Sequence, residues 1–208
     1  MDELIDVRDE AGEPTGEVVW KSEAHRLGLW HRCIHCWIFG VDARKPYLLV
    51  QRRAATKDTW PGYLDLAVGG HLAAGERPLD GLREVEEELG LRVDPGRLVP
   101  LGTRRAEQKI PEGLDREFQD VFLLRDDTPP GDLRLQREEV EAVLGIGLED
   151  AEALGAVGSA PAREYRGGEP SEVEVQVSDF VPNTDDYLRR IAVAARAALG
   201  GGPVERIF

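Results

Sequence analysis

Residues 69–91 read GGHLAAGERPLDGLREVEEELGL and join a glycine-rich segment to an acidic one. In its second half, four apolar residues recur at the spacing of one helical face, which predicts a helix over residues 78–89. They are Leu79, Leu82, Val85 and Leu89. Pro78 suits the first turn of such a helix, and Gly90 suits its C-terminal stop. Because the preceding glycines permit a close approach of the backbone, the stretch predicts a tight loop that leads into a short helix.

Three glutamates of this helix share one face. Glu84, Glu87 and Glu88 stand at i, i+3 and i+4, so their carboxylates emerge side by side. Such anions repel one another, and a hard divalent cation with oxygen ligands relieves that repulsion. The same spacing also occurs in solvated acidic stripes. From the spacing alone, a metal site and a solvated stripe both stay open.

Together with its glycine-rich entrance, the helix resembles the Nudix box. That family's signature is glycine, five residues, glutamate, seven residues, and then Arg-Glu-apolar-x-Glu-Glu-x-Gly-apolar. Gly70 and Glu76 match its first half, and the run from Arg83 to Leu91 matches its second half. Six residues, where the pattern has seven, separate Glu76 from Arg83, which leaves the packing and pairing of Glu76 open. The many matched positions at fixed spacing make the resemblance specific.

The resemblance implies a divalent-metal-dependent hydrolase. It would cleave a diphosphate bond in a nucleoside diphosphate linked to another moiety, or in a related organic pyrophosphate, with Mg2+ or Mn2+ as cofactor. Cations would neutralise the diphosphate oxygens and lower the pKa of the attacking water. The implied catalytic residues are Glu84, Glu87, Glu88, Arg83 and Glu117, and the implied metal ligands are Gly69, Glu84, Glu87 and Glu88. Glu76 would support the box. The general base is a box glutamate or a carboxylate elsewhere, such as Glu117, Glu138 or Glu139.

The resemblance covers roughly residues 4–154 and is closest to the branch that includes isopentenyl-diphosphate isomerase. In those isomerases, histidines and carboxylates bind a metal, and a cysteine just before the Gly-His pair works with a glutamate in proton transfer. The residues at the positions of that metal site are His25, His31, His71, Asp115 and Glu117. Gly69 stands at the cysteine position and has no titratable atom, which favours a hydrolase over an isomerase. A second metal site built on histidines, or purely structural histidines, both stay open. A module that binds nucleotides without cleaving them is a third alternative, against which the intact carboxylates argue.

The two cysteines lie in a strand-like segment. Cys33 and Cys36 are three residues apart and would point to opposite faces of a strand, which argues against a local disulfide. We expect buried free thiols. His31, Cys33 and His35 would share one strand face, but a metal site there needs a further ligand at a fitting position.

Substrate recognition is expected outside the box. Trp60 and Tyr63 can stack on a base or anchor their Pro- and Gly-rich loop. Arg104 belongs to a local basic cluster that suits phosphate binding. Arg52, which precedes the loop of Trp60 and Tyr63, is a further candidate for substrate binding. The substrate-binding candidates are therefore Arg52, Arg104 and Trp60.

The composition limits the partners. Forty acidic residues against 26 basic ones give a net charge of −14, which repels bulk nucleic acid and favours divalent cations as partners of a phosphate substrate. No apolar run approaches the roughly 20 residues of a membrane-spanning helix, and the N-terminus lacks the features of a secretory signal. We expect a cytoplasmic protein that acts on a small-molecule diphosphate. A homodimer is compatible with the resemblance.

Strands and helices alternate along the rest of the chain. Apolar alternation predicts an N-terminal hairpin (4–7 and 17–20), a second hairpin (31–39 and 47–53), and strands at 98–106, 117–124 and 140–146. Ser22 is expected to cap a helical turn, one helix is expected to begin near Leu148, and another to cover about 185–199, followed by a loose tail over 200–208. We therefore predict an α/β (α+β) fold, a Nudix-type α/β/α sandwich with a mixed central sheet, as one domain over residues 1–208.

Overall fold

The computed structural model describes residues 2–43, 45–183 and 185–208. Its strands are β1 (Leu4–Arg8), β2 (Pro14–Trp20), β3 (Trp30–Asp42), β4 (Lys45–Arg53), β5 (Leu64–Leu66), β6 (Val68–His71), β7 (Leu98–Ile110), β8 (Gly113–Arg125), β9 (Val140–Gly147), β10 (Ser159–Tyr165) and β11 (Ser171–Gln176). Its α-helices are α1 (Lys21–Leu27), α2 (Arg83–Leu89), α3 (Leu148–Val157) and α4 (Tyr187–Leu199), and short 3-10 turns cover η1 (Asp80–Leu82), η2 (Pro95–Arg97), η3 (Pro130–Asp132) and η4 (Val177–Asp179).

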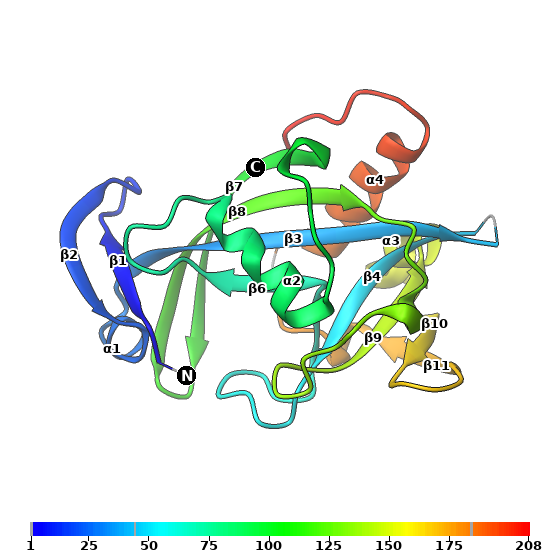
Figure 1. Ribbon diagram of the computed structural model, residues 1–208, viewed down its shortest axis with the longest axis horizontal. Coiled ribbons are helices and arrows are strands. Elements are labelled where there is room, and N and C mark those ends of the chain that lie inside the picture. The colour runs from blue at the N-terminus through cyan, green and yellow to red at the C-terminus, as the bar shows by residue number, and fades with distance from the viewer. Residues whose placement is uncertain (1, 44, 184) are drawn as a thin grey trace.

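Strand β3 is the centre of a mixed sheet (Figure 1). It runs parallel to β8, with His31 beside Glu117 and Cys33 beside Gln119. Its other edge pairs antiparallel with β4 and with β6, where Cys33 lies opposite His71. The strand order β11-β10-β9-β4-β3-β1-β2 continues the sheet to both sides, and β7 extends it beyond β8. The predicted mixed sheet is confirmed.

Helices cover both faces of this sheet. Alternate residues of β3, such as Ile34 and Ile38, pack in one cluster with Val85 and Leu89 of α2. The intervening residues, such as Trp37, belong to a second cluster with residues of α3 and α4. The period of two along β3 therefore assigns each side chain to one helical layer. The predicted α/β/α sandwich is confirmed.

Several predicted elements are confirmed, and others need correction. The two hairpins, the strands β7 to β9, the helix at Leu148 and the C-terminal helix are present, while β5, β6, β10 and β11 were not predicted. The box helix is shorter than predicted, because residues 80–82 form a 3-10 turn before Arg83. Ser22 is not a cap: it lies inside α1 and donates to Asp2 Oδ2 at 2.7 Å.

The C-terminal tail is docked, so the prediction of a loose tail was wrong. The backbone N–H groups of Ile207 and Phe208 donate to the Leu101 carbonyl at 2.8 and 3.0 Å. Both side chains pack against the cluster of α3 and α4. Gly102 permits this approach, because it has a φ of +120° and a Cβ there would lie 1.9 Å from the Phe208 carbonyl oxygen.

In the described part of the chain, no helix has the length and apolarity needed to cross a membrane.

Candidate active site

Glu76 ties the glycine-rich loop to the box helix. Its Oε2 accepts the Ala73 backbone N–H at 2.8 Å, and Arg83 donates through Nε to its Oε1 at 2.9 Å. Gly70 lies against the same helix, since a Cβ at this position would come within 2.4 Å of Glu84 Cγ. The pairing of Glu76 that the shortened spacing left open is therefore present, and the loop and the helix meet closely.

The three glutamates of α2 differ in exposure. The Glu87 side chain is 53% exposed, whereas that of Glu84 is 16% exposed and accepts from Arg83 Nη1 at 2.5 Å. Glu88 is only 3% exposed and accepts from Gln51 Nε2 at 3.3 Å. The pKa of Glu88 is raised to about 8, mainly by burial and also by the neighbouring Glu84 carboxylate. Burial also raises the pKa of Glu84, with a contribution from Glu87. Burial therefore disfavours the ionised forms of Glu84 and Glu88 more strongly than the charges of Arg83 and Lys57 favour them.

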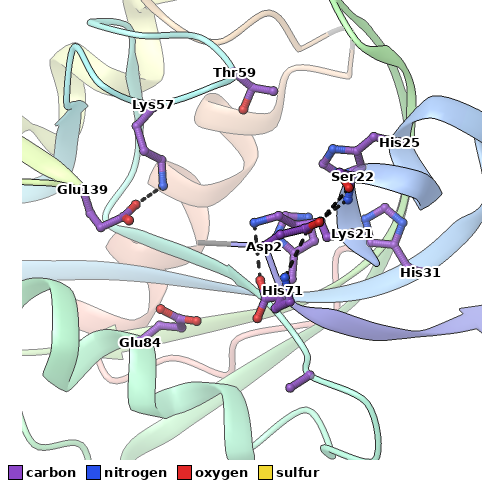
Figure 2. Close-up of polar contacts among 12 residues, drawn as sticks. Asp2, Lys21, Ser22, His25, His31, Lys57, Thr59, His71, Glu84 and Glu139 are labelled. Atoms are coloured by element: carbon purple, nitrogen blue, oxygen red, sulfur yellow. Dashed lines mark hydrogen bonds and ion pairs between the residues drawn. The ribbon is translucent and has the colours of Figure 1, made fainter. Parts of the chain in front are cut away.

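A second carboxylate approaches the box from outside the helix. Glu139 is half-buried and pairs with Lys57, and both face the space beside Glu84 (Figure 2). The charges of both residues act on the pKa of Glu88, which Lys57 lowers and Glu139 raises. Glu138 is exposed, and its backbone carbonyl accepts from the Thr56 hydroxyl at 3.0 Å. Of the two glutamates predicted here, Glu139 is the one near the box.

Three histidines and a carboxylate converge from four elements, and Figure 2 shows the three histidines. His25 comes from α1, His31 from β3, His71 from β6 and Asp115 from β8, and their potential ligand atoms all lie within 4.8 Å of one another. The Nε2 atoms of all three histidines and Oδ1 of Asp115 are buried without a hydrogen-bond partner among the described residues. Glu117 Oε1 lies 3.5 Å from His71 Nε2 and 3.9 Å from His31 Nε2. The residues aligned with the isomerase metal site are therefore together in space.

The three imidazoles of this cluster are in the protonation state that metal binding requires. Burial lowers the pKa of His25 to about 4 and also lowers the pKa of His31 and His71, so the rings are neutral at pH 7. Because the Leu29 carbonyl can only accept, His31 donates to it through Nδ1 at 3.0 Å, and its Nε2 lone pair is left free. Burial raises the pKa of Asp115 to about 9, aided by repulsion from Glu117. Neutral imidazoles beside carboxyl groups form a donor set that fits a divalent transition metal.

The arginines predicted to bind substrate are engaged elsewhere. Arg104 is 9% exposed and donates to Asp185, Asn183 and Gln119. Its guanidinium also lies 4.3 Å from the centre of the Tyr187 ring. Arg52 donates to Glu164 at 2.8 Å and to the Gly62 carbonyl at 3.2 Å. The structure therefore does not support either residue as a free phosphate ligand.

Trp60 and Gly69 lie in different surroundings. Trp60 contacts Tyr63 edge to face at a centroid distance of 5.2 Å, and both line a cavity of about 530 Å³ with Lys109 and Ile110. A recognition role for Trp60 and an anchoring role both remain compatible with this position. Gly69 pairs with His35 across β3 and β6, and a Cβ there would lie 3.7 Å from the His35 ring.

Sequence reasoning missed two features of the site. Lys57 lies in a loop without a recognisable motif, and only the fold reveals that it faces the box. The alternation of His31, Cys33 and His35 was recognised, but not that Glu117 reaches the last two of them. The parallel register of β3 and β8 could supply this signal only after the topology was known.

Comparisons with known proteins identify the family of this chain. The NUDIX domain family model matches residues 29–165. An uncharacterized Nudix hydrolase of Clostridium acetobutylicum is 31% identical over 196 residues, which cover 90% of this chain and 94% of the relative. Nudix hydrolase 3 of Arabidopsis thaliana is 36% identical over 154 residues, which cover 72% of this chain but 20% of that protein. The chain therefore belongs to the Nudix hydrolase family, whose members are metal-dependent enzymes that act on phosphoric anhydride bonds.

Two further similarities concern the branch and the fold. An isopentenyl-diphosphate Delta-isomerase of Corynebacterium diphtheriae is 39% identical over 94 residues, 44% of this chain and 49% of that protein. The crystal structure of DR0079 from Deinococcus radiodurans matches with a TM-score of 0.58 at 22% identity, covering 79% of this chain and 93% of that one. The first agrees with the branch that the sequence resembles, and the second shows the shared fold.

Proposed function

We propose that this protein hydrolyses a diphosphate bond in a nucleoside diphosphate linked to another moiety, or in a related organic pyrophosphate. Mg2+ or Mn2+ is held by Glu84, Glu87 and Glu88, with the Gly69 carbonyl as a further ligand. The observation that carries this proposal is the burial of Glu88, whose carboxylate has Gln51 as its hydrogen-bond partner and a pKa raised to about 8. A buried carboxyl group beside other acids is stabilised as an anion when a cation binds to it.

The residues of the chain divide the work of this reaction. A bound divalent cation neutralises diphosphate oxygens and makes water a better nucleophile. Arg83 holds Glu76 and Glu84 in fixed positions, so that the carboxylates are oriented before substrate arrives. Glu139 is our candidate for the general base, because it is half-buried near Glu88 and is oriented by Lys57. Glu117 remains the other candidate, through its place beside His71.

The histidine cluster favours a second candidate, an isomerase-like reaction on isopentenyl diphosphate. The unpartnered Nε2 atoms and Asp115 Oδ1 form the donor set that this activity would need. Gly69 argues against it, because glycine supplies no proton at the position of the isomerase cysteine. In the hydrolase, the same cluster would hold a second, structural or substrate-orienting cation.

We further propose that the chain acts as one cytoplasmic domain. Its substrate is a small-molecule diphosphate, consistent with the charge of −14. A homodimer would use the N-terminal hairpin, where Val18 and Trp20 are 46% and 51% exposed on β2, the strand at the end of the sheet order.

The test is incubation of the purified protein with Mg2+ or Mn2+ and a panel of diphosphates. The panel contains nucleoside triphosphates, ADP-ribose, dinucleotides, nucleotide sugars and isopentenyl diphosphate, and product masses are the readout. Metal-dependent hydrolysis of a panel member supports the proposal. Isomerisation of isopentenyl diphosphate without hydrolysis contradicts it and selects the second candidate. Tight nucleotide binding without any turnover indicates a binding module.

A further inference from the structure

A thiol, an imidazole and a carboxylate meet beside the histidine cluster. Cys33 and His35 come from β3 and Glu117 from β8, and one potential ligand atom of each lies within 4.8 Å of the other two. Cys33 is 2% exposed and His35 is 9% exposed. The sequence indicated that Cys33 and His35 share a strand face but lacked a further ligand. Glu117 supplies that ligand from the neighbouring strand.

Hydrogen bonds outside this trio orient its members. His35 Nδ1 lies 3.0 Å from the hydroxyl of Tyr187 on α4, which leaves Nε2 as the ring atom that can bind a ligand. Gln119, two residues along β8, donates to Glu117 Oε2 at 2.7 Å. Histidines and carboxylates that bind metals are commonly fixed by such bonds on their remote atoms. The trio therefore has the supporting contacts of a built metal site.

Glu117 borders both groups. Its Oε1 lies 3.5 Å from His71 Nε2, while its carboxylate is also within reach of Cys33 and His35. A carboxylate in this position can bridge two cations, as in enzymes that hold two metals about 4 Å apart. The polar face of β3 thus offers two adjacent positions for a metal ion.

We propose that Cys33, His35 and Glu117 form a second metal position that takes a thiophilic divalent cation, Zn2+ or Co2+, next to the histidine cluster and bridged to it by Glu117. Thiolate and imidazole ligands select such cations over Mg2+. The Cys33 thiolate and the Glu117 carboxylate would supply negative charge, which a buried cation requires. Three protein ligands leave a fourth coordination position open, as in catalytic zinc sites. This site goes beyond the proposed hydrolase and does not depend on the box carboxylates.

Cobalt reports sulfur ligation directly. The full chain, stripped of metal, is titrated with Co2+ and followed by near-ultraviolet absorption and by elemental analysis. The parent should show a thiolate-to-cobalt charge-transfer band. Cys33→Ser should lose this band and one equivalent of Co2+. His71→Ala should lose cobalt from the histidine cluster but keep the band.

Cys36→Ser is the matched control. Cys36 is a fully buried thiol on the same strand, but it packs on the other face of the sheet, in the cluster of α2. This variant should keep the band and the full complement of Co2+. A parent without the band, or a band that survives in Cys33→Ser, overturns the proposal.

A second measurement covers the case in which Cys33→Ser does not fold. X-ray absorption at the zinc edge of the Zn2+-loaded parent should detect a sulfur neighbour at about 2.3 Å. A shell of nitrogen and oxygen alone would contradict the proposal. Both readouts are independent of diphosphate turnover, so failure of the hydrolase assignment and failure of this site are distinguishable.

Discussion

Arg83 donates through Nε to Glu76 Oε1 at 2.9 Å, although one residue fewer separates the two than in the usual Nudix box. The same guanidinium also donates to Glu84 Oε1 at 2.5 Å. The 3-10 turn over residues 80–82 precedes α2, and the α-helix itself begins at Arg83. The shorter connection is therefore accommodated before the helix, and the carboxylates keep their common face.

Replacing Glu88 with glutamine should abolish most of the turnover. Glu88→Gln removes the charge of a proposed metal ligand but keeps its shape and its place beside Gln51. We expect metal-dependent hydrolysis to fall on the order of 100-fold or more, because the loss affects electrostatic stabilisation of the reaction. The measurement is kcat on whichever panel substrate is cleaved, with circular dichroism to verify the fold.

Glu86→Gln is its control. Glu86 lies on the same helix but is exposed and paired with Arg92. Its replacement should leave turnover unchanged. Near-full activity of Glu88→Gln would contradict the proposed metal site.

The same carboxyl group should make the metal-free protein less stable as the pH rises. The pKa of Glu88 is about 8 in the folded protein and its ordinary value in the unfolded chain is 4.5, so the folded protein binds this proton more tightly. The stabilisation that comes from the tighter binding of this proton is therefore fully present below pH 4.5 and is lost as the pH rises to about 8. As the pH rises across this window, the free energy of unfolding of Glu88→Gln should increase relative to that of the parent by on the order of 3 kcal/mol.

Urea denaturation in the presence of a chelator, repeated from pH 5 to pH 9, measures this difference. If the difference in free energy of unfolding between the two proteins stays constant with pH, the pKa of Glu88 is the same in the folded and unfolded states. Added Mg2+ should reduce the gap at pH 8, because a cation stabilises the ionised carboxylate of the parent alone.

A methyl group at Gly70 should displace the Glu84 side chain while every carboxylate of the box is still present. The Cβ of Gly70→Ala would lie 2.4 Å from Glu84 Cγ and 2.7 Å from Cδ, so the Glu84 side chain must move. A misplaced ligand costs catalysis strongly, and we expect at least about a 10-fold loss of kcat. The Cβ of Gly155→Ala on α3 would meet no atom of the described residues within 4 Å, and this variant should keep full activity. Equal activity of the two variants would mean that Glu84 adjusts without cost.

The sequence predicted those parts of the molecule whose signals are local. The apolar period of the box helix, the alternation in the hairpins and the fixed spacing of Glu84, Glu87 and Glu88 each lie within a short segment. The histidine cluster was available only through the resemblance, because His25, His31 and His71 meet through the pairing of β3 with β6 and the position of α1. Arg104 looked available for phosphate, since its partner Asp185 is distant in sequence and approaches only when α4 packs. Long-range packing therefore decided the surroundings of Arg104, whereas the errors at Ser22 and at the start of the box helix concern local helix boundaries.

The docked C-terminus gives a stability prediction that the sequence did not suggest. The Phe208 ring contacts Tyr187 edge to face at a centroid distance of 5.4 Å, and the Arg190 guanidinium lies 4.1 Å from its centre. Phe208→Ala should lower the free energy of unfolding by about 1–3 kcal/mol, below the cost for a fully buried phenylalanine because the ring is half-buried. Val157→Ala, at a side chain that is 71% exposed on α3, should change it by less than about 0.5 kcal/mol. Urea denaturation of both variants measures the difference, and an unchanged free energy in Phe208→Ala would show that the tail adds nothing to the core. Because Tyr187 also lies within hydrogen-bond distance of His35, the same variant should loosen the orientation of that imidazole and weaken Co2+ binding there.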